Sequence, residues 1–211
     1  MALNAKQLQK KLERKKKKKA QAVKKSGQRI SATSSGSSSY ARYPVHECLV
    51  PANLFELGLG TVLMSRRAPN GTIAVSFFLL DVFCLGVKNA GFRVCSSDEY
   101  EYQFKDSVFS AADDTDYLQI DAPQFRKLIE EAAAYASSLG FSTHPDYREA
   151  RRLFGAVDAS TCDIAFEFGK DGKPLYIGGP NDSPSRIRQV MHLLQQHRGE
   201  GSVDDLIGTG E

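Results

Sequence analysis

Three consecutive residues, His46, Glu47 and Cys48, have side chains that could do chemistry. On a strand, His46 and Cys48 would point to the same face, because side chains alternate between the two faces. Such a pair could act as a nucleophile with its base, or as half of a metal site. A zinc site needs further ligands, and the other His and Cys residues of the chain show no ligand spacing. We therefore expect core packing at these positions, with no metal and no cofactor bound.

Asp81 is the second candidate, because it falls within the most apolar stretch of the chain, residues 73–87. One strand of that length would span about 50 Å, which is too long for a domain of this size. We expect a central strand that ends near Leu80, followed by a turn or short helical segment over residues 81–88. A buried carboxylate needs partners. Asp81 would therefore either cap the N–H groups of that turn or serve as a functional acid.

Glu47 and Asp81 together would suit a hydrolase or nuclease that works with carboxylates, with or without a divalent metal. This alternative requires Glu47 and Asp81, with Asp163 as an optional third acid, to converge in one cleft. The sequence leaves that convergence open.

The strongest electrostatic feature is a lysine-rich arm. Residues 1–42 hold 13 Lys and Arg residues and one acid, whereas the remaining 169 residues hold 15 bases and 24 acids. Lysine-rich arms bind phosphate backbones by releasing counterions, without reading sequence. The arm has no aromatic residue before Tyr40, so it cannot stack on bases. The residues expected to contact nucleic acid are Lys10, Lys11, Arg14, Lys15, Lys16, Lys17, Lys18, Lys19, Lys24 and Lys25.

Three roles for the arm are open. It could attach to nucleic acid through residues 6–25, with RNA or a ribosome favoured over DNA. It could be a solubilising tail, or it could fold back on the acidic body and gate a site there. We favour the first role, which makes the chain a non-catalytic binding protein whose acidic body recognises a partner. A pure protein–protein interaction module is the other alternative to an enzyme.

An acidic segment, residues 98–121, holds eight acids and a single base, Lys105. We expect it to be a solvated connection or a docking surface for a basic protein partner. The acids are Asp98, Glu99, Glu101, Asp106, Asp113, Asp114, Asp116 and Asp121.

The composition divides the chain into three parts. A disordered arm and Ser/Gly linker are expected over residues 1–42, a single domain over 43–199 and a flexible tail over 200–211. The pattern of the body predicts an α+β fold, a mostly antiparallel sheet built from two hairpins and packed by about three helices. Asn70-Gly71 and Asp171-Gly172 are the hairpin turns. The hairpin strands are expected over 61–67, 72–80, 164–168 and 175–177, and a further strand over 45–50.

The helices carry clear boundary signals. Asp121, followed three residues later by a Gln, is an acidic form of the capping box, and residues 125–139 place apolar side chains on one face. A shorter helix is expected after Pro145. The last helix begins at Pro184, with Ser183 as its N-cap.

Residues 81–88, with the sequence DVFCLGVK, resemble a D-x-(aromatic)-C-L-G-(V/L)-K core shared by a family of uncharacterised bacterial proteins. Residues 171–180 and Pro184 are similar to the closing hairpin and helix of that family. The resemblance covers about residues 44–201 and leaves the arm outside. Since the family has no known activity, the resemblance implies one intact domain in a bacterial cytosol and assigns no catalytic residue.

The cysteines and the hydropathy indicate the compartment. The four cysteines contain no Cys-x-x-Cys pair, and no hydrophobic signal segment precedes the lysine run. No stretch approaches the roughly 18 apolar residues of a membrane span. We therefore expect a cytoplasmic protein with free, buried thiols and no membrane partner.

Overall fold

The computed structural model of the chain describes residues 36–110, 115–178, 182–198 and 207–208. The predicted disordered arm, with all ten basic residues expected to contact nucleic acid, lies outside the described residues. So does most of the predicted tail.

One antiparallel sheet forms the centre of the body, in the order β4-β3-β2-β1-β5. Helices accompany it, so the predicted α+β class with an antiparallel sheet is confirmed. The strands are β1 (Val45–Pro51), β2 (Leu59–Arg67), β3 (Ile73–Asp81), β4 (Gly86–Cys95) and β5 (Tyr117–Gln119).

The β2–β3 hairpin forms at the predicted Asn-Gly turn. Gly71 has a φ of 81°, and the side chain of Asn70 accepts the N–H of Thr72 at 3.1 Å. A positive φ is open to glycine at little cost, which is why this dipeptide closes hairpins. The sequence therefore placed this pair of strands correctly.

Strand β4 was not predicted. The expected turn or helix over residues 81–88 is a short turn over 82–85, and β4 begins directly after it at Gly86. Two glycines and several polar residues hide the strand pattern, because glycine has low β-propensity. Gly91 is required, since a Cβ there would lie 2.3 Å from the ring of Phe77 on β3.

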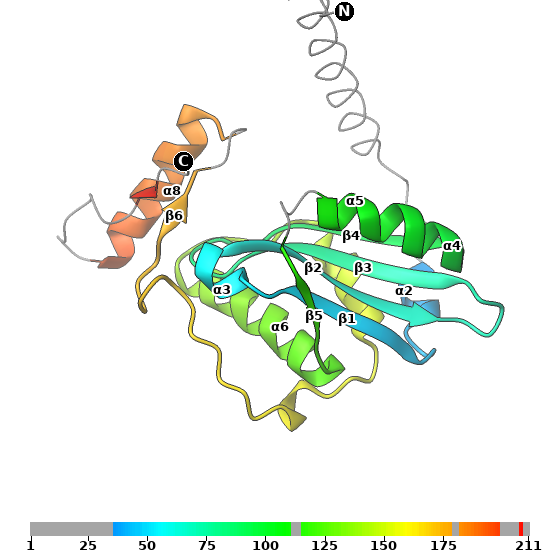
Figure 1. Cartoon of the computed structure of the whole chain (residues 1–211). Coiled ribbons are helices and arrows are strands. Elements are labelled where there is room, and N and C mark those ends of the chain that lie inside the picture. The colour runs from blue at the N-terminus through cyan, green and yellow to red at the C-terminus, as the bar shows by residue number, and fades with distance from the viewer. Residues whose placement is uncertain (1–35, 111–114, 179–181, 199–206, 209–211) are drawn as a thin grey trace, which may run out of the picture. The chain divides into compact units, whose positions relative to one another are not determined.

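Both faces of the sheet are covered by helices (Figure 1). One face packs on α6 (Ala122–Ser138), α7 (Tyr147–Ala150) and the 3₁₀ turn η3 (Arg151–Phe154). The other packs on a continuous helical run, α4 (Ser97–Glu99), the wide π-helical η1 (Tyr100–Lys105) and α5 (Asp106–Phe109).

The helical run from α4 to α5 corrects the prediction of a solvated connection over the acidic segment. Tyr100 and Phe104 are buried against Leu63 and Val75 of the sheet. The two aromatics are four residues apart, so they lie on one helical face. The acids of the run lie around this apolar stripe, which is typical of an amphipathic surface helix.

Helix α6 buries the apolar face that its periodicity predicts, including Phe125, Leu128 and Ile129. Asp121 stands at the N-cap, but its side chain accepts no capping hydrogen bond, so the capping-box prediction is wrong. Pro123 explains the difference, because it removes one of the N–H groups that such a side chain accepts.

The second predicted hairpin is wrong in its first strand. Residues 164–168 form neither helix nor strand, although the turn itself is present, with φ values of 52° at Asp171 and 72° at Gly172. Phe166 and Phe168 both pack against the core. This explains why apolar and polar residues alternate here, as they do in a strand, although no strand forms. Strand β6 (Tyr176–Ile177) pairs instead with β7 (Ile207–Gly208), in parallel.

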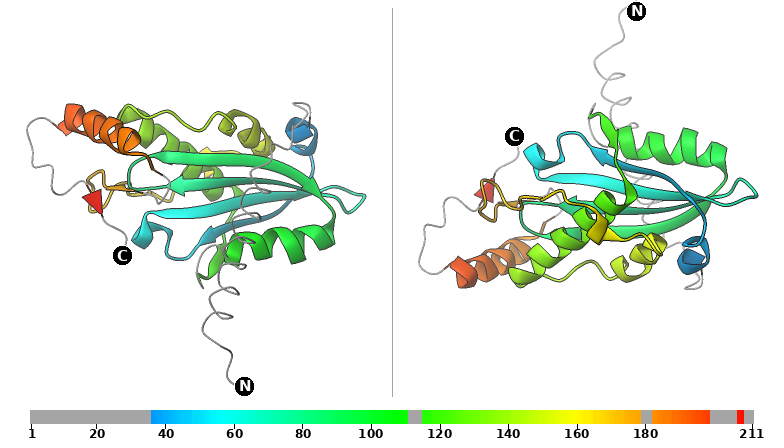
Figure 2. Two further views of the ribbon diagram at one scale, coloured as in Figure 1. Left: turned by 90° about the horizontal axis from the view of Figure 1, so that it is seen from above. Right: turned by 90° about the horizontal axis from the view of Figure 1, so that it is seen from below.

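The last helix, α8 (Pro184–Arg198), begins at the predicted proline. The hydroxyl of Ser183 accepts the N–H of Arg186 at 3.2 Å, as an N-cap does. Val190 and Leu194 pack in one buried cluster with Ala136 and Leu139 at the end of α6, and Figure 2 shows α8 at the edge of the body in both views.

The remaining helical elements are short: α2 (Gly36–Tyr40), α3 (Leu54–Leu57) and η4 (Ala159–Thr161). Helix α2 lies within the predicted linker, yet Ser37 is fully buried. The folded body therefore begins at or before Gly36 and not at residue 43.

Candidate functional site

His46 and Cys48 do not share a face, contrary to the prediction. The pairing of β1 with β2 shifts register between Val45 and Glu47, so a β-bulge lies at His46. A bulge adds one residue and redirects the side chains around it. The imidazole of His46 lies 6.1 Å from the ring of Tyr100 on η1, whereas Cys48 is buried in the core beneath α6.

The environment of Cys48 also excludes a nucleophile. Burial raises the pKa of its thiol to about 12, and the nearby Arg66 offsets this only in part. Because the thiolate is the reactive form, Cys48 is an inert core residue. This agrees with the packing role expected from the sequence.

His46, Glu47 and Glu101 form the cluster most similar to a metal site among the described residues. One ligand atom from each residue lies within 4.8 Å of the others. The ammonium of Lys105 stands between the carboxylates, 3.2 Å from Oε1 of Glu47 and 3.0 Å from Oε2 of Glu101. Burial lowers the pKa of Lys105, but the hydrogen bonds and charges of the two glutamates outweigh it, so the pKa is raised. The protonated Lys105 therefore compensates the negative charge of the two glutamates and links η1 to β1 by an ion pair.

Asp81 caps the turn that follows it. Its Oδ1 accepts the N–H of Phe83 at 3.1 Å and the N–H of Cys84 at 2.9 Å. Burial raises the pKa of this carboxyl to about 6, although Lys88 and the backbone donors oppose the shift. The contacts are those of the structural cap considered from the sequence.

Glu47 and Asp81 lie at opposite ends of the sheet. Glu47 pairs with Ser65, Ser65 pairs with Val75, and Asp81 stands six residues beyond Val75 on β3. At about 3.3 Å per residue this separation is about 20 Å. The two metal ions of a hydrolytic centre lie only about 3.5–4 Å apart. The two carboxylates therefore do not form one cleft.

A pocket lined by four arginines is the feature of the body best suited to an anion. It is a cavity of about 490 Å³ where α2 meets α6, α7 and η3. Its lining residues are Ser38, Ala41, Arg126, Glu130, Arg148, Arg151, Arg152, Phe154 and Gly155.

The charges of this arginine pocket are only partly balanced. Arg126 is 3.0 Å from Glu130 and donates to the carbonyl of Val157 at 2.6 Å, so its guanidinium is held in place. Arg152 is 2.6 Å from Glu149. Arg148 is exposed and forms no ion pair within the described part of the chain.

Arg151 is held weakly in the pocket. It lies 3.9 Å from Glu130, which Arg126 already engages, and about half of its side chain is exposed. Among the described residues, Arg126 and Arg151 share the carboxylate of Glu130, and Arg148 adds a positive charge that no ion pair balances.

Helix α2 completes the pocket. The Ser37 hydroxyl donates to the carboxylate of Glu149, and Gly155 of the adjacent turn lies against Ala41. A Cβ at Gly155 would lie 2.7 Å from the carbonyl oxygen of Ala41, and its φ is 56°. In the sequence, the lysine-rich segment ends at Lys25, and residues 26–35 separate it from α2.

Sequence reasoning missed this pocket. Arg148, Arg151 and Arg152 place three bases in five residues, and this density was the available signal. Arg126 lies more than twenty positions earlier on α6, and only the packing of α6 beside η3 brings it to the others.

No helix among the described residues is long and apolar enough to cross a membrane. Comparisons of the chain with protein-family models, with curated proteins and with solved structures find no match.

Proposed function

We propose that this protein is a non-catalytic nucleic-acid-binding protein that holds RNA phosphates in the arginine pocket and along the lysine-rich arm. The observation that carries the proposal is the set of four guanidinium groups in this pocket, those of Arg126, Arg148, Arg151 and Arg152, of which Arg148 forms no ion pair among the described residues. Guanidinium groups present planar sets of donors that match phosphate oxygens.

The shape of the site favours a flexible single strand over a DNA duplex. A pocket receives a phosphate from a strand that can bend into it, and proteins recognise RNA mainly in unpaired, splayed segments. On the longest helix at the pocket, α6, the basic residues Arg126 and Lys127 are each paired with a glutamate of the same helix, so α6 offers no free basic face to a major groove. A ribosomal surface presents RNA of this kind. The bacterial cytosol suggested by the DVFCLGVK segment is the setting that we propose.

The arm and the pocket have distinct tasks in this proposal. Lysines supply attraction that depends on salt and not on sequence. The arginines, held by carbonyls and carboxylates of the body, fix where one phosphate lies.

The alternative of a hydrolase or nuclease has less support. It needed Glu47 and Asp81 in one cleft, and the strand register separates them. A pure protein-interaction module would leave the excess charge of the arginine pocket without a role.

The test measures the affinity for a fluorescent single-stranded RNA by anisotropy at several salt concentrations. The variant R148Q/R151Q removes two pocket cations, and R186Q/R188Q removes two exposed cations from α8 as a matched control. We expect the slope of log K against log salt to fall by about 1.4 in the pocket variant, since each contact with a single strand contributes about 0.7. The control should retain the wild-type slope.

Deleting residues 1–30 separates the arm from the pocket. We expect a large loss of affinity at low salt, with the residual binding still sensitive to R148Q/R151Q. Equal RNA affinity of the pocket variant and its α8 control would show that the arginine pocket does not bind RNA. Unchanged affinity after the deletion would show that the arm does not bind RNA. Duplex DNA bound as tightly as single-stranded RNA would overturn the preference for RNA.

A further inference from the structure

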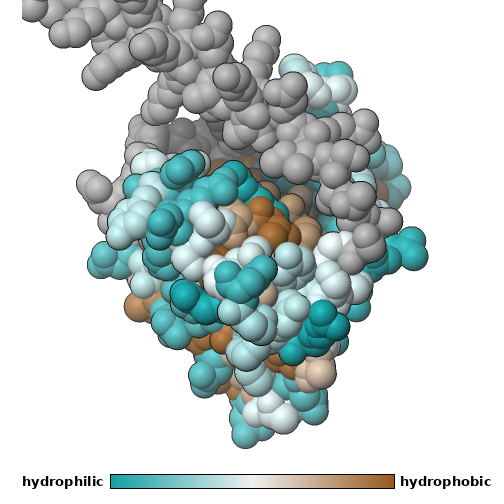
Figure 3. All heavy atoms as spheres, turned by 90° about the vertical axis from the view of Figure 1, so that its right-hand side faces the viewer, coloured by the Kyte–Doolittle hydropathy of each residue, from teal (hydrophilic) through white to brown (hydrophobic). Residues whose placement is uncertain are grey.

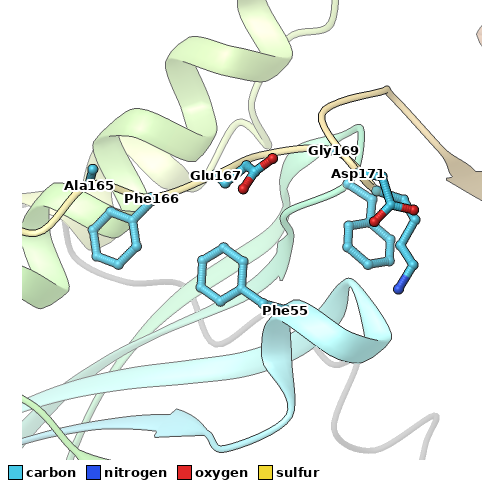
Figure 4. A pocket seen from close by; sticks show the side chains of 8 residues that line it. Phe55, Ala165, Phe166, Glu167, Gly169 and Asp171 are labelled. Carbon is cyan, nitrogen blue, oxygen red and sulfur yellow. The ribbon is translucent and has the colours of Figure 1, made fainter.

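A second pocket lies between α3 and the segment that leads to β6, away from the arginines. It is a cavity of about 460 Å³ (Figure 4). Its lining residues are Phe55, Phe83, Ala165, Phe166, Glu167, Gly169, Lys170 and Asp171.

Two aromatic rings form one wall of this pocket. The rings of Phe55 and Phe166 are parallel, with an interplanar angle of 1° and centroids 6.0 Å apart. Phe55 is 39% exposed, and Leu57 and Leu59 beside it are exposed to a similar or greater degree. By contrast, the described part of the face in Figure 3, at the opposite side of Figure 1, is mostly hydrophilic.

Two carboxylates line this pocket. Figure 4 shows Glu167 beside the ring of Phe55, whereas Asp171 lies farther along the same segment, beyond Gly169. Both are exposed, and neither forms an ion pair with any described residue. Lys170 lies at the same end of the pocket as Asp171, with its ammonium 5.5 Å from the centre of the Phe83 ring. The chain itself therefore makes one cation–π contact here, and the Phe55–Phe166 pair holds no cation from the described residues.

We propose that this aromatic–carboxylate pocket binds a lysine or arginine side chain of a partner protein. The face of an aromatic ring attracts a cation, and the attraction grows when the cation is desolvated. The unpaired carboxylate of Glu167 beside the rings adds Coulomb attraction, and that of Asp171 adds to it from farther along the pocket. A phosphate would be repelled by both acids. A purely apolar ligand would gain nothing from them.

The chain beside the pocket indicates how the partner approaches. Residues 163–168 have no backbone hydrogen bond to any described residue. Free N–H and C=O groups in such a segment can pair with an added strand, which is a common mode of peptide recognition. An extended partner segment with basic side chains would use these groups for affinity and the pocket for specificity.

This site replaces the acidic segment 98–121 as the surface for a basic partner. Glu99 is paired with Arg93, and Glu101 with Lys105, so these charges are engaged within the body. This proposal adds a protein partner, bound by the acidic body, to the proposed function. It does not depend on RNA binding, and its test contains no nucleic acid, so either can fail alone.

The test follows amide chemical shifts of the full chain by NMR during titration with small probes. N-acetyl-lysine methylamide carries the cation. N-acetyl-norleucine methylamide has the same apolar stem without the charge. We expect saturable shifts at residues 166–171 with the lysine probe and none with the norleucine probe. A pentapeptide of alternating valine and lysine should bind more tightly than the single residue, with added shifts over residues 163–168.

Two variants decide whether the carboxylates and rings are responsible. E167Q/D171N should lower the affinity for the lysine probe about tenfold, which corresponds to about 1.4 kcal/mol of binding free energy. D98N/D106N removes two exposed acids from the helical run and should leave the affinity unchanged. F55L should also weaken binding, because leucine keeps the apolar volume and loses the ring face. Equal shifts with lysine and norleucine would show an apolar pocket only, and no shift with either would overturn the proposal. R148Q/R151Q should bind the lysine probe as the wild type does.

Discussion

Gly86 and Ala132 approach so closely that a Cβ on residue 86 would lie 2.7 Å from the carbonyl oxygen of Ala132. Gly86 has a φ of 62° and begins β4, while Ala132 lies on the buried face of α6. The contact allows the end of the β3–β4 turn to pack against the helix backbone. It also gives a physical reason for the glycine in the DVFCLGVK segment.

We expect Gly86→Ala to destabilise the protein by at least about 2 kcal/mol. The left-handed backbone costs about 1–2 kcal/mol for a residue with a Cβ, and crowding in a packed core adds about 1–3 kcal/mol. Gly71→Ala is the control, because Gly71 has a φ of 81° and nothing within 4 Å of its added Cβ. Gly71→Ala should therefore lower the free energy of unfolding only by the cost of the left-handed backbone, about 1–2 kcal/mol. Urea unfolding followed by circular dichroism measures both, and equal losses would contradict the close approach to Ala132.

Arg66 is buried and joins β2 to η3, and we expect Arg66→Met to cost about 1–3 kcal/mol for each buried carbonyl that it leaves without a donor. Its guanidinium donates to the carbonyls of Leu153 and Phe154, each at 2.7 Å, and also to the carbonyl of Tyr43. Methionine fills the space and leaves these acceptors without their donor. Lysine would restore the charge without the planar fork, so Arg66→Lys should recover little.

The neighbouring Arg67 provides the control for Arg66. It is exposed, and its side chain forms a hydrogen bond with the ring of His46 at 3.0 Å and no ion pair with any described residue. Arg67→Met should therefore change the free energy of unfolding by no more than about 0.5 kcal/mol. Similar losses for the two variants, measured by urea unfolding, would show that the carbonyl contacts of Arg66 contribute little.

The parts of the fold that the sequence predicted are those with a local cause. The Asn-Gly turn defines the β2–β3 hairpin, and apolar periodicity defines α6. Strand β4 was not predicted, because its two glycines obscure the strand pattern. Gly86 and Gly91 allow close contacts with α6 and β3, and a single sequence does not show those contacts. The helical run from α4 to α5 was not predicted either, because its many acidic residues obscured the helical spacing of Tyr100 and Phe104.

The sites divide in the same way. The cap made by Asp81 follows from a carboxylate at the end of a buried strand, so it was predictable. The bulge at His46 was not, because register depends on the partner strand. Arg126 joins Arg148 and Arg151 only through the packing of separate helices. Such convergence has no signal in local spacing.

The pKa of Asp81 makes stability depend on pH. Burial raises this pKa from 3.8 to about 6, so the folded state binds the proton more tightly than the unfolded state does. The stabilising contribution is therefore fully present below about pH 4 and is lost as the pH rises through about 6. Two pKa units correspond to about 3 kcal/mol.

Asp81→Asn isolates this contribution. Its side-chain oxygen can still accept the N–H groups of Phe83 and Cys84, and it carries no charge. We expect the difference in unfolding free energy between variant and wild type to shift in favour of the variant by about 3 kcal/mol from about pH 4 to about pH 8. Urea unfolding across this range measures it. A constant difference would show that Asp81 titrates as an exposed carboxyl does.

The thiols should divide into one that reacts readily and three that are protected. All four cysteines are free, as expected from the sequence; Cys48, Cys84 and Cys95 are buried, whereas Cys162 is half-buried. Burial raises the pKa of each of the three buried thiols. Because thiolate reacts and thiol does not, we expect a chromogenic disulfide reagent to label Cys162 first in the native protein and all four after unfolding in guanidinium. Cys162→Ser should abolish the fast phase. A fast phase that survives this substitution would mean that one of the buried cysteines opens to solvent in the native state.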